Sequence, residues 1–161
     1  MERFNIEEMY NKYFKTVYRF LLALTSNPDI AEELTQETFY KALIKINTYR
    51  KECKLSTWLC QIAKNLWLNE LKKQNKIVSM ENDNIELMKI QSNLEDDFLE
   101  EQDKQELYAK INKLDDDIKH IFFLKLSGNF TFKEIGEILG KSEVWARVNF
   151  YRGKQKLKEV E

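Results

Sequence analysis

Cationic and amide side chains recur along residues 147–156, and they are the groups best suited to chemistry in this chain. Guanidinium and ammonium groups bind phosphate oxygens, and Arg and Asn can also pair with guanine and adenine edges in a major groove. On one helix face this set predicts contact with duplex DNA, whereas charge alone would indicate only a solvated surface. The set is Arg147, Asn149, Arg152, Lys154 and Lys156.

The residues before and within this stretch predict the helix-turn-helix that would position these groups. Thr131 and Glu134 have the spacing of a capping box, which begins a helix by satisfying backbone N–H groups. Gly140 suits a left-handed helix end, and Ser142 can cap a second helix after a short turn. On that second helix a narrow stripe of small and apolar residues is expected to face inward. The stripe is Ala146, Phe150, Gly153 and Leu157.

The overall composition favours a globular, all-helical chain. Of its 161 residues, 43% are hydrophobic and 33% are charged, and one Pro and four Gly leave few helix breakers. The net charge of −1 hides a segregation of charge. Residues 45–76 hold eight Lys or Arg against two acids, residues 77–103 hold one Lys against nine acids, and residues 140–161 hold six Lys or Arg against three acids. Such segregation predicts different partners for different segments.

Apolar residues at helical spacing predict three helices before residue 75. The first covers residues 10–24, and a turn at residues 26–29 supplies a cap and a first-turn Pro for the second. The second helix buries one face over residues 31–46 and is followed by a polar loop. The third begins near Thr57 behind a Ser56 cap.

The second half of the chain is predicted to begin with two more helices, from about residue 102, before the helix-turn-helix. Residues 76–103 carry no strong core pattern and are expected to form an acidic linker. Asp115–Asp117 open a helix, where capping explains three acids better than metal binding does. Phe122 and Phe123 are expected in the core.

The His and Cys side chains, which serve catalysis or metal binding in many proteins, are predicted to have structural roles in this chain. His120 is expected to be a structural residue, Cys60 a core residue and Cys53 a loop residue, with a reactive thiol as the less favoured alternative. Two Cys and one His do not make a zinc site, and no Gly-rich phosphate loop or nucleophile motif is present. We therefore predict no cofactor, no metal and no catalytic activity. Without a signal peptide or a membrane-length apolar run, we expect a cytoplasmic protein with reduced thiols and no membrane insertion.

Three strings together give the chain a family resemblance. They are AEELTQETFYKAL at residues 31–43, STWLCQIAKNLWLNELKK at 56–73, and the C-terminal block at 114–157. With these strings in this order, the chain resembles the extracytoplasmic-function (ECF) sigma factors of bacterial RNA polymerase, the minimal sigma type. The resemblance implies an all-α fold of two small helical domains. Residues 1–75 would form a sigma region 2-like bundle, 76–103 an acidic flexible linker, and 104–161 a region 4-like helix-turn-helix domain.

The resemblance also implies residue roles. The first domain would bind core polymerase and a flipped base of the −10 strand, for which an aromatic or apolar platform, polar groups and nearby cations are suited. The residues implied for the −10 strand are Tyr49, Arg50, Lys51, Lys54, Trp58, Lys64, Asn65, Asn69, Lys72 and Lys73. Those implied for the −35 duplex are Thr131, Arg147, Asn149, Arg152, Lys154 and Lys156. Those implied for the polymerase clamp coiled coil are Glu33, Leu34, Gln36, Glu37 and Phe39.

The partners that the resemblance implies are promoter DNA, an anti-sigma factor and core RNA polymerase, through the clamp coiled coil of its largest subunit and its flap region. The linker is implied to thread the RNA exit channel. The recognition helix departs from the family pattern, because Val148 stands in place of a Ser and Asn149 in place of a cation. The −35 sequence is therefore expected to differ from the commonest family motif. Trp145 is expected to pack on the neighbouring helix rather than to stack on deoxyribose or touch a partner.

Two other functions compete with promoter recognition. A stand-alone helix-turn-helix regulator would explain the C-terminal block, and it should bind a palindromic duplex as a dimer without polymerase. It gives no role to the first block. A nucleic-acid-processing enzyme is disfavoured because the sequence lacks a metal or nucleophile constellation, and turnover by the purified chain would revive it.

Overall fold

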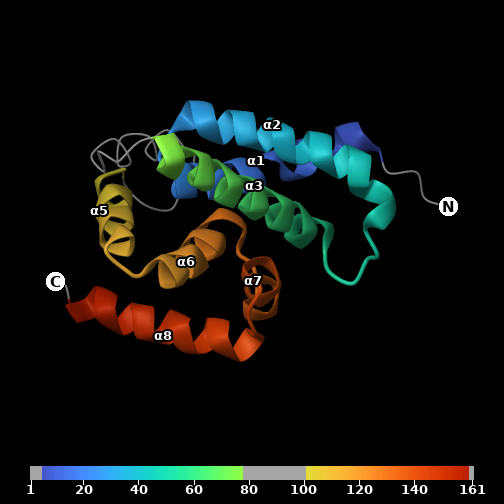
Figure 1. The fold of residues 1–161 in the computed structure, drawn as a ribbon. Coiled ribbons are helices and arrows are strands. Elements are labelled where there is room, and N and C mark those ends of the chain that lie inside the picture. The colour runs from blue at the N-terminus through green and yellow to red at the C-terminus, as the bar shows by residue number, and fades with distance from the viewer. Residues whose placement is uncertain (1–4, 78–100, 160–161) are drawn as a thin grey trace.

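The described part of the chain is built from helices. The computed structural model describes residues 5–77 and 101–159, and within these ranges it has seven α-helices, one short 3₁₀ helix and no strand (Figure 1). This confirms the predicted all-α class. The helices are α1 (Ile6–Thr25), α2 (Pro28–Lys45), η1 (Ile46–Thr48), α3 (Leu55–Ile77), α5 (Glu101–Asn112), α6 (Asp116–Gly128), α7 (Phe132–Leu139) and α8 (Glu143–Glu159).

The turn between α1 and α2 forms as its residues predict. Ser26 ends α1 in the left-handed conformation, with φ of 58°. The Asn27 side chain then accepts hydrogen bonds from the backbone N–H groups of Asp29 (2.9 Å) and Ile30 (3.2 Å), and Pro28 occupies the first helical position. Both helices are therefore fixed by local capping chemistry.

The third helix starts earlier than its sequence suggests. The backbone N–H of Trp58 donates to the carbonyl of Lys54 at 3.0 Å, and α3 begins at Leu55. Ser56 therefore lies inside the first turn, and the predicted Ser56 cap is wrong. The reason is that the backbone of Lys54 already supplies the first helical acceptor.

One hydrophobic core runs through the described residues and joins the two predicted blocks. Helix α1 packs against α6, and α3 packs against α7, so the C-terminal helices lie directly under the first three (Figure 1). Phe122, Phe123 and Cys60 are buried, as expected. The largest fully buried side chains come from both blocks. They are Val17, Phe20, Leu21, Leu22, Leu59, Ile111, Ile121, Phe123, Leu124, Ile135 and Ile138.

The two ends of the predicted linker, residues 76–77 and 101–103, belong to helices. Helix α3 continues to Ile77 and α5 begins at Glu101, while the predicted linker residues 78–100 lie outside the described ranges.

The acidic start of α6 differs in detail from its prediction. Asp115 occupies the N-cap position, but its side chain makes no capping hydrogen bond and lies 3.8 Å from Lys156 Nζ instead. Asp116 and Asp117 lie in the first turn, where they favour the positive end of the helix. The expected side-chain cap at Asp115 is therefore wrong, while the favourable charge at the helix start is confirmed.

Candidate nucleic-acid interface

The predicted helix-turn-helix is present as α7, a tight turn and α8. The Thr131 hydroxyl accepts from the N–H of Glu134 (3.1 Å), and the Glu134 carboxylate accepts from the N–H of Thr131 (2.8 Å), which completes the capping box. Gly140 ends α7 with φ of 70°. The Ser142 hydroxyl accepts from the N–H of Trp145 at 3.0 Å and caps α8. These predictions are confirmed, and the Thr131 hydroxyl is used in holding the motif.

Close backbone approach shapes the turn of this motif. A Cβ added at Gly136 would lie 2.7 Å from the carbonyl oxygen of Lys141, and the N–H of Lys141 donates back to the Gly136 carbonyl at 2.8 Å. The turn can be this tight only because Gly136 has no side chain.

The predicted inner stripe of α8 packs on α6. Ala146 and Gly153 are buried, and a Cβ added at Gly153 would lie 2.5 Å from the Phe122 ring. The rings of Phe122 and Phe150 have centroids 4.9 Å apart. Trp145 is half-buried and packs against the hydrophobic core. The position of α8 on the molecule is thus fixed by its inner face.

The outer face of α8 carries the predicted cations. Arg152 is exposed, Arg147 pairs with Glu143 at 3.1 Å, and Lys154 Nζ lies 5.1 Å from the centroid of the Phe150 ring. Exposed ion pairs of this kind are weak enough to exchange for phosphate. Asn149 differs from the others, because its amide donates to the carbonyl of Trp145 at 2.9 Å and is half-buried. One of its two amide hydrogens is therefore already used within the helix.

An aromatic pair marks the second candidate surface. The rings of Tyr49 and Trp58 have centroids 5.2 Å apart and planes inclined at 33°. The Tyr49 hydroxyl donates to the carbonyl of Cys53, which closes the basic loop on itself, and burial raises the pKa of Tyr49. Both rings are half-buried and line an open pocket of about 440 Å³. The pair is therefore ordered but accessible from solvent.

Most predicted strand-binding residues of α3 and its preceding loop are exposed. Lys64 is the exception among the cations, since it is half-buried. Burial, with the nearby charge of Lys141, lowers the pKa of Lys64. The exposed members are Arg50, Lys51, Lys54, Asn65, Asn69, Lys72 and Lys73.

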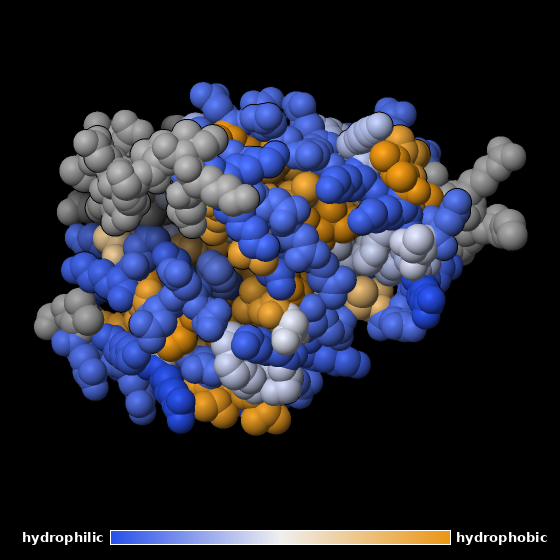
Figure 2. Space-filling view, in the orientation of Figure 1, coloured by the Kyte–Doolittle hydropathy of each residue, from blue (hydrophilic) through white to orange (hydrophobic). Residues whose placement is uncertain are grey.

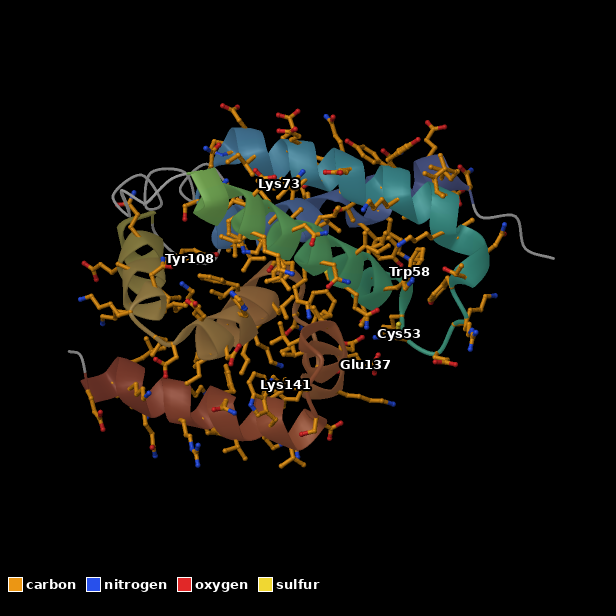
Figure 3. All side chains as sticks on the ribbon, viewed as in Figure 1. Cys53, Trp58, Lys73, Tyr108, Glu137 and Lys141 are labelled. Carbon is orange, nitrogen blue, oxygen red and sulfur yellow. The ribbon has the colours of Figure 1, made fainter. Side chains whose placement is uncertain are left out.

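Helix α7 lies against the loop and the aromatic pair. The Gln61 amide on α3 donates to the backbone carbonyl of Glu137 on α7 at 2.9 Å. Lys54 Nζ lies 3.5 Å from the Glu134 carboxylate. Figure 3 shows Trp58, Cys53 and Glu137 gathered where the start of α3, the loop and α7 meet. The first helix of the helix-turn-helix thus lies directly beside the predicted strand-binding surface.

The outer face of α2 contains only part of the predicted polymerase contact. Glu33, Gln36 and Glu37 are exposed. Leu34 and Phe39 are only 3% and 5% exposed because they pack into the core. They cannot contact a partner in this structure, and we remove them from the contact face.

The side chains that could serve catalysis or metal binding lie where burial or nearby charge disfavours those roles. Burial lowers the pKa of His120 to about 4, so this side chain is neutral at pH 7. Burial, followed by the charges of Glu137, Glu52 and Glu134, raises the pKa of Cys53 and disfavours a thiolate. In the described ranges, no group of three or more His, Cys, Asp or Glu side chains is placed to hold a metal ion. Across the same ranges, no helix has the length and hydropathy to cross a bilayer.

Sequence reasoning missed two exposed apolar groups. Leu43 and Ile44 are 46% and 62% exposed at the end of α2, beside the exposed Tyr40. Val144, Val148 and Tyr151 are exposed along α8. The signal was present in each case, because these residues fall off the inward stripes of their helices.

Comparisons with known proteins all identify sigma factors as similar to this chain. Residues 9–77 match the family model described as Sigma-70 region 2. The chain is 31% identical to the ECF RNA polymerase sigma factor SigM of Bacillus subtilis, over 96% of this chain and 94% of that protein. It is 28% identical to the RNA polymerase sigma factor YlaC of the same organism, over 98% and 92%. In fold it is similar to the sigma factor RpoE of Bartonella quintana, in complex with the anti-sigma factor NepR, with a TM-score of 0.76 at 20% identity over 95% and 94% of the two chains.

Proposed function

The chain belongs to the ECF RNA polymerase sigma factors, and from this membership we propose which of its surfaces performs each step of promoter recognition. A sigma factor of this type directs core RNA polymerase to specific promoters and initiates transcription. We assign capture of the −10 strand to the aromatic pair Tyr49 and Trp58 together with Asn65. The single observation that supports this most is the ordered, solvent-accessible ring pair within a cationic loop and helix. Aromatic rings bind unstacked bases, and the neighbouring cations bind the strand's phosphates.

We assign the −35 duplex to α8. Its position is fixed by a buried inner face, so its outer face can enter a major groove as one rigid surface. Arg147, Arg152, Lys154 and Lys156 supply the positive charge on that face. Because Asn149 is bonded to its own helix, we give the cations the larger part in this contact.

We assign core polymerase binding to the outer face of α2. Glu33, Gln36 and Glu37 provide an acidic and amide surface that can steer a basic partner helix. The exposed Leu43 and Ile44 extend this surface with apolar area, and Figure 2 shows hydrophobic atoms over the C-terminal part of α2. Apolar side chains surrounded by polar ones are typical of the centre of a protein interface.

Because both DNA surfaces belong to one compact body, they cannot reach both promoter elements at once. A compact chain of this length measures about 40 Å across, from its expected radius of gyration. About 25 base pairs separate the elements, which is roughly 85 Å at about 3.4 Å per base pair. We therefore propose that α7 separates from α3 when the holoenzyme binds a promoter. In this scheme residues 1–75 and 104–161 act as separate domains joined by the acidic linker.

The remaining assignments rest on the family. We propose an anti-sigma factor as a further partner, since the similar RpoE structure is a complex with one. We propose that the chain has no catalytic activity, because preferential binding of the unpaired strand is enough to favour melting. We place it in the cytoplasm, where core polymerase and the chromosome lie.

The test of the −10 assignment is Asn65→Ala in the holoenzyme. Promoter melting, measured by permanganate reactivity of unpaired thymines, should fall about two- to tenfold because one hydrogen bond to the strand is lost. Affinity for core polymerase should stay unchanged. Asn11→Ala, an exposed amide on α1, is the matched control. Normal melting by the Asn65 variant would refute the assignment, and dimeric binding to a palindrome without core would favour a stand-alone regulator instead.

A further inference from the structure

The outer face of α8 has an apolar ridge between its cations. Val144, Val148 and Tyr151 are 62%, 40% and 55% exposed. An α-helix turns about 100° per residue, so these three side chains fall on one line, opposite the buried Ala146 and Gly153. Figure 2 shows hydrophobic atoms at the lower edge of the molecule, where the N-terminal part of α8 lies.

Cations lie on both sides of this ridge. By the same helical geometry, Arg147 lies on one flank and Arg152 on the other. This arrangement matches a major groove, where phosphates border both walls and base edges form the floor. A protein partner would not require positive charge on both flanks, so charge complementarity favours DNA as the occupant.

The ridge offers few hydrogen-bonding groups to base edges. Valine side chains have neither donors nor acceptors. Asn149 donates to the carbonyl of Trp145 and lies toward the buried side of the helix. The one apolar feature that a base pair presents in the major groove is the C5-methyl group of thymine.

We propose that Val144 and Val148, with the ring of Tyr151, recognise thymine methyl groups in the −35 element. The proposal rests on the proposed −35 role of α8 and specifies what this helix reads. Val148 lies at the centre of the ridge and is the main specificity-determining residue. The cations on either side fix the register of the helix on the duplex and add affinity that does not depend on sequence.

The experiment replaces single thymines of a −35 duplex with deoxyuridine. This change removes the methyl group and keeps the base pair. A promoter is first selected with holoenzyme from a library randomised in the −35 region, and affinity is then measured for each substituted duplex. Wild type should bind about fourfold more weakly for each methyl group lost against the ridge. Deoxyuridine outside the −35 element should have no effect.

Variants of Val148 make the test specific. V148S should lose the response to deoxyuridine at the thymine that Val148 contacts, while V148T, which keeps one methyl group and nearly the same shape, should retain part of it. R152A should weaken binding to all duplexes alike and reduce the salt dependence by about one charge, while keeping the response to deoxyuridine.

Two results would overturn the inference, and they can be told apart from failure of the −35 assignment. If deoxyuridine never weakens wild-type binding while R152A does, α8 contacts DNA but does not read methyl groups. If V148S impairs binding to a protein partner and leaves the deoxyuridine response intact, the ridge is a protein-docking surface. If neither R152A nor V148S changes duplex binding, the −35 assignment itself is wrong.

Discussion

The hydrogen bond from Gln61 to Glu137 gives a direct test of the closed arrangement. Its donor lies on α3 beside the aromatic pair, and its acceptor is a backbone carbonyl near the end of α7. Carbonyls in the last turn of a helix have no partner within the helix. Gln61 therefore satisfies a polar group that α7 cannot satisfy itself. Gln61→Ala should leave that carbonyl to water and destabilise the closed form.

The expected size follows from the bond itself. It is a neutral, half-buried amide–carbonyl bond of 2.9 Å, for which a net contribution of about 1 kcal/mol is typical. That energy corresponds to about a fivefold change in the ratio of open to closed molecules. When only the open form binds a strand, the apparent dissociation constant scales inversely with the open fraction. Gln61→Ala should thus bind the −10 strand about fivefold more tightly.

The assay is fluorescence anisotropy of a labelled non-template −10 oligonucleotide with the free protein. Gln74→Ala is the matched control, since Gln74 bonds at 3.4 Å to Glu70 on its own helix and does not reach α7. It should leave the affinity unchanged. With core polymerase present, the variant and wild type should bind alike, because the holoenzyme is already open. Weaker or unchanged binding by the free Gln61 variant would refute the closed-form reasoning.

Three further predictions test other parts of the structure. Gly136→Ala should lower the free energy of unfolding in urea by about 1–3 kcal/mol through a backbone clash, whereas Gly140→Asn, at a left-handed position with open space, should change it by less than about 0.5 kcal/mol; equal effects would contradict the tight turn. Charge removal at Glu33 and Glu37, each to Gln, should weaken core binding about threefold at low salt and less at high salt, and an unchanged affinity would exclude this face. Burial lowers the pKa of His120 to about 4, so this side chain takes up a proton more readily in the unfolded chain. Its effect on the free energy of unfolding is therefore most favourable above about pH 6.5. On the order of 3 kcal/mol of that free energy is lost as the pH falls toward 4. A His120→Gln variant should show a flatter acid profile in thermal unfolding, and the same slope as wild type would contradict that origin.

Features controlled by near neighbours in the chain were predictable from the sequence. The capping box at Thr131 and Glu134, the left-handed Gly140 and the Ser142 cap each depend on groups within a few residues. Helical periodicity likewise identified the buried stripe of α8, because the spacing that faces a core is a local property.

Features controlled by distant neighbours were not predictable. Gln61 and Glu137 are far apart in the sequence, and no local signal links them. Leu34 and Phe39 are apolar residues within a family string, and only the packing of α2 on α1 and α3 shows that they are buried. The start of α3 shifted because a backbone acceptor at Lys54 replaced the expected side-chain cap.

The charges at the contact between α3 and the helix-turn-helix connect opening to DNA binding. The Lys54–Glu134 pair attracts, but Lys54 is 74% exposed, so solvent screens most of the gain. Across the same contact Lys141 helps to lower the pKa of Lys64, which means that the closed form disfavours the charge on Lys64. The attraction and the repulsion therefore act in opposite directions, and the closed form is held mainly by apolar packing and the hydrogen bond from Gln61 to Glu137. On opening, Lys64 regains water and moves away from Lys141. In our assignment Lys64 then contacts a phosphate of the −10 strand. The positive charge that the closed form disfavours is thus one that binding of the strand stabilises.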